Sequence, residues 1–238
     1  MKNTVLLSIL TMFSTSLFGQ DIDTYFGKAN TFFATYVSNG KVDYKRINSS
    51  PESLHELMDM AEGIKVSKGD EDIYKAFWIN AYNIAVIKRV INNYPTKSPL
   101  DISGFFEKTT YKIAGKSITL NDIENKILRA QFNDARFHFV LVCGAIGCPP
   151  LINKAYLPQS LDDQLNTQTR LALNGDYFIK INHKKKRIEG SEILKWYKED
   201  FIGEDKNEID FINQYRTDKI PRDYKLGYFP YNWSLNQL

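Results

Sequence analysis

The spacing of hydrophobic residues divides the chain into helical and strand-like stretches. Apolar side chains at spacings of three and four predict helices over residues 22–37, 51–61, 70–94, 119–128, 161–171, 191–197 and 205–216. Short runs of strand-forming residues beside turn residues predict extended segments at residues 42–47, 110–113, 117–119, 177–182, 187–189 and 224–233. Helices and hairpins in this order predict the α+β fold class, as a single domain with several helices around a small mixed or antiparallel sheet.

The longest apolar run beyond the N-terminus covers residues 136–142, with the sequence RFHFVLV. A run rich in Phe and Val that stops at a glycine is typical of a strand buried on both faces. Cys143 and Cys148 follow this run, and the residues GAIG between them predict a tight loop. Loops that follow strands often carry functional residues, so we expect a site at this loop.

The predicted helix over residues 70–94 carries two amides on its apolar face. Asn80 lies at the centre of the stripe, and Asn83 lies within about 60° of it. A buried amide without partners costs about 1–3 kcal/mol, so both side chains need partners. Either they bind backbone groups of a neighbouring loop, or they orient a substrate or a catalytic group. Trp78 and Tyr82 lie on the opposite face, which indicates a helix covered on both sides.

The composition indicates a globular protein with an N-terminal export signal. Of its 238 residues, 43% are apolar, which is enough for one folded domain over residues 21–238. Residues 1–20 have the basic start, apolar centre and small-residue end of a signal peptide, with cleavage expected near Gly19 or Gln20. We therefore expect a periplasmic or secreted protein. No later segment is apolar enough to span a bilayer.

The charge distribution does not favour nucleic acid as a partner. The net charge is only +3, and the basic residues are spread along the chain. The one dense basic run, residues 183–187, lies between two predicted strands. A solvated hairpin turn is one interpretation of this run, and a binding patch is the other. The expected partner is a small-molecule or peptide ligand of unknown identity.

Three residues suggest thiol chemistry, because a thiolate needs a base or a positive neighbour to form near neutral pH. They are His138, Cys143 and Cys148. In an extended strand, His138 and Cys143 would lie about 16 Å apart on opposite faces. His138 would then reach Cys148 only if the loop folds back, and it is otherwise a core residue. A disulfide between the two cysteines is the alternative. We expect no metal and no cofactor, because no zinc, phosphate-loop or nucleophile-elbow pattern is present.

Four ordered blocks of sequence carry a family resemblance. They are residues 76–83 (AFWINAYN), 120–124 (LNDIE) with 127–129 (ILR), 136–149 (RFHFVLVCGAIGCP) and 195–201 (KWYKEDF). Together they resemble the family called domain of unknown function 547, over a core of residues 70–201, and residues 231–236 (YNWSLN) are similar to its members as well. The resemblance implies no established activity. Many members carry a histidine where this chain has Asn125.

The first functional hypothesis is a thiol-dependent hydrolase or transferase that acts on an amide or peptide-like substrate. Cys143 is its nucleophile, Asn80 and Asn83 orient the reacting groups, and His138 or Glu124 accepts the proton.

The second hypothesis is a non-catalytic envelope protein that binds a ligand or a partner. In that protein a disulfide between Cys143 and Cys148 holds the turn rigid, and neither thiol is free. The expected substrate-binding residues are Asn83 and Cys148.

Overall fold

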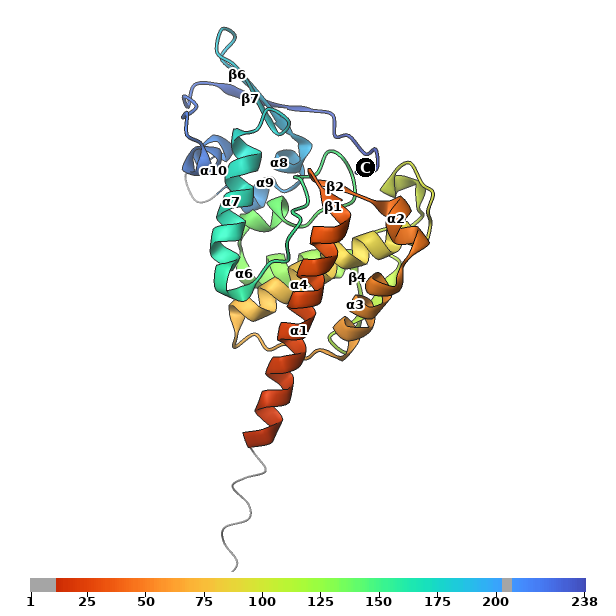
Figure 1. Cartoon of the computed structure of the whole chain (residues 1–238). Helices are drawn as coiled ribbons and strands as arrows, with labels where there is room; N and C mark the ends of the chain where they lie inside the picture. The colour runs from red at the N-terminus through yellow and green to blue at the C-terminus, as the bar shows by residue number, and fades with distance from the viewer. Residues whose placement is uncertain (1–11, 203–206) are drawn as a thin grey trace, which may run out of the picture.

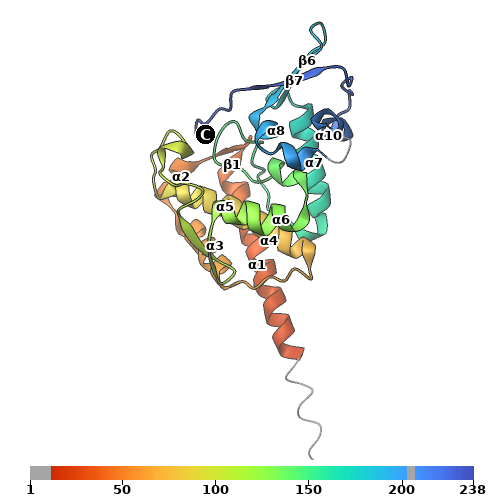
Figure 2. The ribbon, with the colours of Figure 1, turned by 180° about the vertical axis from the view of Figure 1, so that it is seen from behind.

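The computed structural model describes residues 12–202 and 207–238 (Figure 1). Residues 1–11 of the predicted signal peptide lie outside the described residues. The first helix begins at Met12, and Figures 1 and 2 show its start extending away from the body of the molecule. Over the described residues, none of the helices combines the length and the apolar character needed to cross a bilayer.

Helices make up most of the secondary structure. The α-helices are α1 Met12–Tyr36, α2 Tyr44–Ser49, α3 Glu52–Gly63, α4 Glu71–Ile91, α5 Leu120–Asp122, α6 Ala130–Phe132, α7 Leu161–Asn174, α8 Glu192–Trp196, α9 Lys198–Phe201 and α10 Glu208–Tyr215. The 3-10 helices are η1 Pro99–Asp101, η3 Ala135–Phe139 and η4 Pro158–Ser160, and η2 Ile123–Arg129 is a π-helix.

The strands form three small sheets. They are β1 Val37–Ser38, β2 Lys41–Val42, β3 Thr110–Ile113, β4 Lys116–Thr119, β5 Ile179–Asn182, β6 Arg187–Ser191 and β7 Lys225–Phe229. β1 with β2 and β3 with β4 are antiparallel hairpins, whereas β6 pairs antiparallel with β5 and parallel with β7. The predicted α+β class is confirmed, and so is the predicted mixed sheet. The basic run at residues 183–186 forms the exposed turn between β5 and β6.

Helix α4 lies at the centre of the core. Glu71 and Asp72 occupy its first turn and Lys88 and Arg89 its last, which suits the two ends of the helix dipole. Its middle is buried on every side, including the face with Trp78, as the sequence predicted. Contacts from α2, α3, η2 and η4 cover it. Figure 2 shows α5 and α6 passing in front of α4, with α1 behind.

The predicted strand over residues 136–142 is wrong. The chain forms η3 at Ala135–Phe139 and continues without a strand to the cysteines. Asp134 starts η3 by accepting the Arg136 N–H, and its carboxylate also binds the Arg136 side chain. Apolar burial was predicted correctly, but the side chain of Asn83, rather than a neighbouring strand, satisfies the backbone beyond η3. Tertiary contacts therefore override the strand-like sequence.

Two smaller predictions also fail near the N-terminus. The segment expected to be extended over residues 42–47 leaves the strand after Val42, because Asp43 caps α2 by accepting the Arg46 N–H. Ser50 ends α2 rather than capping α3, whose N-cap position is Pro51. The other predicted helices and hairpins are present, with boundaries shifted by a few residues, and residues 205–206 of the last predicted helix lie outside the described residues.

The last residues of the chain connect the N-terminal hairpin with the cysteine loop. Asn236 accepts the Val42 N–H at 2.8 Å through its carbonyl and the Tyr44 hydroxyl at 2.8 Å through its side chain. Its own N–H donates to Gly144 at 3.0 Å. The C-terminal segment, defined as residues 231–238, thereby positions the loop on which the candidate site is built.

Candidate functional site

The cysteine loop, defined as residues 143–148, is held by the C-terminal segment through main-chain hydrogen bonds. Ile146 N–H donates to Ser234 and Gly147 N–H donates to Asn232, each at 2.8 Å. Glycine is required at position 147, because a Cβ there would lie 2.8 Å from the ring of Tyr231. The shape of the loop is therefore set by the backbone and by an aromatic ring packed against it.

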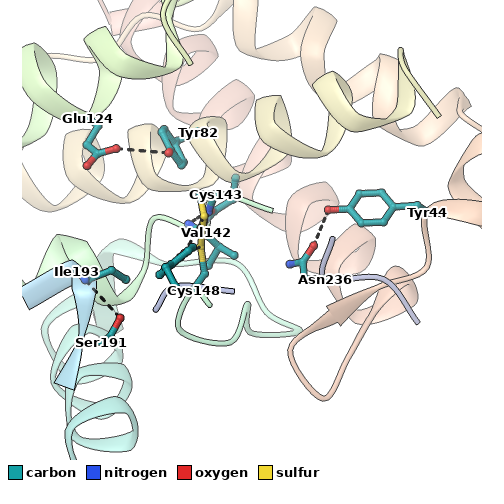
Figure 3. The surroundings of a disulfide bond; sticks show 11 residues. Tyr44, Tyr82, Glu124, Val142, Cys143, Cys148, Ser191, Ile193 and Asn236 are labelled. Atoms are coloured by element: carbon teal, nitrogen blue, oxygen red, sulfur yellow. Dashed lines mark hydrogen bonds between the residues drawn. A yellow bond between two sulfur atoms is a disulfide. The ribbon is translucent and has the colours of Figure 1, made fainter. Parts of the chain in front are cut away.

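Cys143 and Cys148 are joined in a disulfide, with their Cα atoms 6.4 Å apart. The Tyr231 hydroxyl lies 3.0 Å from the sulfur of Cys143 and 2.9 Å from that of Cys148. The main-chain N–H of Cys143 also donates to the Cys148 sulfur at 2.9 Å. Figure 3 shows the disulfide between the Tyr82–Glu124 pair on one side and the Tyr44–Asn236 pair on the other. The disulfide alternative is thus the one present in the structure.

The disulfide forms part of the wall of a pocket with a volume of about 240 Å³. Its lining combines aromatic rings, amides, carboxylates and both sulfurs: Tyr82, Phe106, Glu107, Asn121, Glu124, Asn125, His138, Leu141, Cys143, Cys148, Ile193, Trp196, Tyr197, Tyr231 and Trp233. Elements far apart in the sequence contribute, including α4, η2, η3, α8 and the C-terminal segment. The pocket is therefore a product of the tertiary fold.

One wall of the pocket is a cluster of three aromatic rings. The ring centroids of Trp196 and Tyr231 are 5.0 Å apart, those of Tyr231 and Trp233 are 4.7 Å apart, and those of Trp196 and Trp233 are 5.9 Å apart. Trp196 retains 45% of its surface exposed although it lies in a cluster. A large aromatic side chain left open beside a pocket provides surface for a ligand.

A second wall carries carboxylates. Glu124 lies in the first turn of η2, and π-helical turns occur frequently at functional sites. Its carboxylate accepts the Tyr82 hydroxyl at 3.4 Å. Burial, and then the charge of Glu124, raises the pKa of Tyr82 and also that of Tyr197. Both phenols therefore keep their protons at neutral pH and donate toward Glu124. Glu107 stands exposed at the rim.

His138 lines the pocket as part of an ionic network. Its Nε2 lies 2.6 Å from Asp200, which also binds Arg129 at 2.6 and 3.0 Å. Burial alone would raise the pKa of Asp200, but the hydrogen bonds from His138 and Arg129 outweigh it and hold that pKa well below its usual range. The imidazole stacks on Tyr197 with centroids 4.0 Å apart. The group that contacts the two sulfurs is Tyr231, and the partner of His138 is Asp200.

The two asparagines of α4 lie elsewhere. The Asn80 amide donates to Ala76 and Tyr156 carbonyls and accepts the Tyr156 N–H. Asn83 donates to the Val140 carbonyl at 2.9 Å and accepts the Val142 N–H at 2.9 Å. This arrangement matches the structural interpretation of the pair, and neither side chain lines the pocket. A role for them beside a bound molecule stays a prediction.

The predicted site residues therefore divide into two groups. Cys143, Cys148, His138 and Glu124 meet at one pocket, although the expected strand would have kept His138 away from Cys143. Sequence reasoning missed the aromatic rings and Asp200. Their only sequence signal was that the resembling blocks at residues 195–201 and 231–236 contain them. No cluster of three or more His, Cys, Asp or Glu side chains with the arrangement of a metal site occurs within residues 12–202 and 207–238.

Fold and site together define a helix-rich α+β domain with a disulfide in the wall of an aromatic pocket. Residues 66–171 match the family model described as "Protein of unknown function, DUF547", the family that the sequence blocks resemble. The matched segment contains α4, η2 and the cysteine loop, whereas the block at residues 195–201 and the C-terminal segment lie beyond it. No curated protein and no solved structure matches the chain.

Proposed function

We propose that the protein binds a small ligand with a positively charged organic group, such as a substituted ammonium, in the pocket beside the disulfide. The observation that carries this proposal is the combination of aromatic rings and carboxylates in one lining. Among the described lining residues, Glu107 and Glu124 are acidic and none is Lys or Arg. A ligand of this class would find both an attractive charge and polarisable ring faces there.

The Arg129 side chain leaves this negative character in place. Arg129 lies beside the pocket, but its guanidinium makes two hydrogen bonds to Asp200 and packs over the Tyr197 ring with 4.7 Å between guanidinium carbon and ring centroid. The negative charge of Asp200 therefore neutralises the positive charge of Arg129. Within the described part of the chain, Glu124 and Glu107 form no ion pair. Burial alone would lower the pKa of Arg129, but its hydrogen bonds to Asp200 and the charges of Asp200 and Glu124 raise it. Glu124 acts on Arg129 without a direct ion pair, so both carboxylates can still meet a ligand.

The aromatic wall supplies the second attraction. A cation over the face of Trp or Tyr gains about 0.5–1 kcal/mol at an exposed site and about 2 kcal/mol when desolvated. Trp196, Tyr231 and Trp233 give such faces at the pocket. A volume of about 240 Å³ exceeds the roughly 150 Å³ of a cavity that holds benzene, so a compact organic cation fits.

Titration calorimetry with choline, against an uncharged analogue that has carbon in place of its nitrogen, tests the proposal. We expect choline to bind at least about tenfold more tightly, which corresponds to roughly 1.4 kcal/mol. Glu124→Gln keeps the shape of the side chain and removes its charge, and it should reduce choline binding about tenfold. Glu189→Gln, on the exposed face of β6, is the matched control and should bind choline like the parent protein.

Equal affinity for choline and its uncharged analogue would contradict the proposal. So would a Glu124→Gln variant that binds choline as tightly as the parent. The measured affinities also separate the two walls. Trp196→Leu should weaken the binding of both ligands, while Glu124→Gln should weaken only the binding of the charged one.

We also propose that the protein is exported to an oxidising compartment. The disulfide and the signal-like residues 1–20 support this location. Ile22, Tyr25 and Phe26 are buried, so cleavage near Gln20 would keep the packed part of α1. The intact mass of the exported protein tests both points: its N-terminus should lie near residue 21, and alkylation should require prior reduction. Full alkylation without reduction would contradict an oxidised pair.

A thiol-dependent hydrolase or transferase is the second candidate, because Cys143, His138 and Glu124 line one pocket. In the oxidised pair neither sulfur is a thiol, so such chemistry would begin only after reduction. Hydrolysis of amide probes by the reduced protein, abolished by Cys143→Ala, tests this candidate. Equal hydrolysis by the Cys143→Ala protein would exclude it.

A further inference from the structure

The disulfide adds little to a loop that is already fixed. Main-chain hydrogen bonds from Ile146 and Gly147 to the C-terminal segment, and from Asn236 to the Gly144 carbonyl, hold the loop at several points. The bond closes a ring of only a few residues, and short rings restrain the unfolded chain least. A purely bracing role is therefore small, although the bond lies in the wall of a pocket.

The two sulfurs are not equivalent. Cys143 is partly exposed, whereas Cys148 keeps only 5% of its surface accessible. A thiol that enters the pocket would therefore attack Cys143 more readily, and Cys148 would be the leaving group. Thiol–disulfide exchange is faster when the leaving sulfur is stabilised as a thiolate.

The structure provides that stabilisation before any reaction. The Cys148 sulfur accepts the Cys143 main-chain N–H and the Tyr231 hydroxyl, each at 2.9 Å. Hydrogen bonds to a charged acceptor are stronger than those to a neutral one, so both gain strength as negative charge develops on Cys148. Tyr231 keeps its proton for this purpose, because burial raises the pKa of its phenol.

We propose that the protein carries out thiol–disulfide exchange with small thiols that bear an ammonium group. Cys143 is the sulfur attacked, Cys148 is the leaving group, and Tyr231 is a catalytic residue that stabilises the departing thiolate. The preference for a positive charge rests on the proposed function and on Glu124 and Glu107, whereas the exchange itself does not.

The chemistry balances with two thiols and no further reactant. The first thiolate attacks Cys143, a mixed disulfide forms, and the Cys143–Cys148 bond breaks with its electron pair on Cys148. A second thiol attacks the substrate sulfur of the mixed disulfide and releases Cys143 as a thiolate. The two thiols are oxidised to their disulfide, the cysteine pair is reduced to a dithiol, and the two protons that the thiols lose pass through solvent to the two cysteine thiolates. A low-molecular-weight disulfide reoxidises the pair by the reverse steps.

The test compares the folded protein with the same chain unfolded in urea. Reduction by cysteamine, mercaptoethanol and mercaptopropionate is quenched by alkylation and followed by intact mass. Division by the rate for the unfolded chain removes the intrinsic reactivity of each thiol. We expect folding to accelerate the reaction with cysteamine at least about tenfold, with less acceleration for mercaptoethanol and least for mercaptopropionate.

Two sets of variants assign the roles. Tyr231→Phe should slow the folded protein about tenfold, shift its equilibrium with cystamine toward the oxidised form, and leave the unfolded rate unchanged. Tyr177→Phe, with its partly exposed ring far from the pocket lining, is the control. Cys148→Ser should form a mixed disulfide with cystamine much faster than Cys143→Ser does.

Each outcome is decisive. Slower reduction in the folded state for all three thiols would overturn the exchange activity, while the choline experiment would still judge the binding site separately. If folding accelerates reduction by all three thiols equally, whatever their charge, the exchange activity would be supported and the ammonium preference overturned. If Cys148→Ser and Cys143→Ser form the mixed disulfide with cystamine at equal rates, the assignment of Cys143 as the attacked sulfur would be overturned.

Discussion

The polar groups on two faces of α4 have different kinds of hydrogen-bond partner. On one face, the Asn83 amide is matched at both of its polar atoms by fixed main-chain groups of Val140 and Val142. On the other, the Tyr82 hydroxyl meets the Glu124 side chain at the edge of a pocket. Polar groups that the backbone satisfies completely define architecture, whereas polar groups that face a cavity keep capacity for a ligand. Adjacent positions on one helix thus serve structure and binding separately.

The largest expected effect on stability comes from removing the side chain of Asn83. Asn83→Ala leaves the Val140 carbonyl and the Val142 N–H buried without partners, and each such group costs about 1–3 kcal/mol. We expect a loss of about 3 kcal/mol in the free energy of unfolding, measured by urea denaturation. Asn93→Ala is the control, since its exposed amide bonds only the Arg89 carbonyl, and should cost less than about 0.5 kcal/mol. A loss below about 1 kcal/mol for Asn83→Ala would contradict the architectural role.

An intermediate effect on stability is expected from the ionic network of Asp200 with His138 and Arg129. The pKa of Asp200 is lower in the folded protein than its ordinary value of 3.8, so its ionisation stabilises the fold above that pH. This stability is lost as the pH falls below about 4 toward the folded-state pKa. Asp200→Asn should therefore lower the free energy of unfolding by about 2 kcal/mol at neutral pH, and the difference should shrink in acid.

Unfolding curves at a series of pH values measure this effect. Asp223→Asn is the matched control, because Asp223 pairs with Lys186 at the exposed hairpin and such pairs contribute less than about 1 kcal/mol. A constant difference between the Asp200→Asn variant and the parent from neutral pH into acid would contradict the linkage.

A smaller effect is expected when the disulfide is reduced. Because the C-terminal segment holds the loop independently, reduction should lower the free energy of unfolding by less than about 2 kcal/mol. Urea denaturation with and without a phosphine reductant measures it. Unfolding of the protein on reduction alone would show that the bond, rather than the hydrogen bonds, holds the loop.

The smallest effect on stability should come from the binding face. Glu124→Gln keeps hydrogen-bond acceptors for Tyr82 and should change the free energy of unfolding by less than about 0.5 kcal/mol, while choline binding falls about tenfold. A loss of stability as large as that of Asn83→Ala would erase the distinction between the two faces. Thermal unfolding beside calorimetry on the same preparation makes the comparison direct.

Helical periodicity explains why much of the fold could be predicted. The stripe around Asn80 and the acidic start of α4 both depend on residues close in sequence, and the helix lies where these signals place it. The hairpin of β3 and β4 likewise follows from the Ala114–Gly115 turn, whose two residues have positive φ angles. These features are local, so the sequence contains the information that specifies them.

Residues 136–142 could not be predicted in the same way. Apolar residues without a clear period fit a buried strand as well as a 3-10 helix with an irregular continuation. The choice depends on Asn83, a residue far away in the sequence, which supplies the hydrogen bonds that a neighbouring strand would supply otherwise. The predicted placement of His138 and Cys143 on opposite faces of one strand failed for the same reason.

The site itself was only half visible in the sequence. Cys143 and Cys148 attract attention because cysteines are rare in this chain. Trp196 and Tyr231 lie in two aromatic-rich stretches, residues 196–197 and 228–233, and only folding brings them beside the disulfide. Nothing in the spacing of Tyr231 indicates that its hydroxyl contacts both sulfurs.

The dependence of the cysteine loop on the C-terminal segment also has a consequence for biosynthesis. Asn232, Ser234 and Asn236 are synthesised dozens of residues after the cysteine loop, and the loop lacks these hydrogen-bond partners until they emerge. The pocket is therefore completed only after the C-terminal segment has been translated. During synthesis the two cysteines emerge dozens of residues before the C-terminal segment that contacts them. A fusion placed directly after Leu238 would hinder the packing of that segment against the loop.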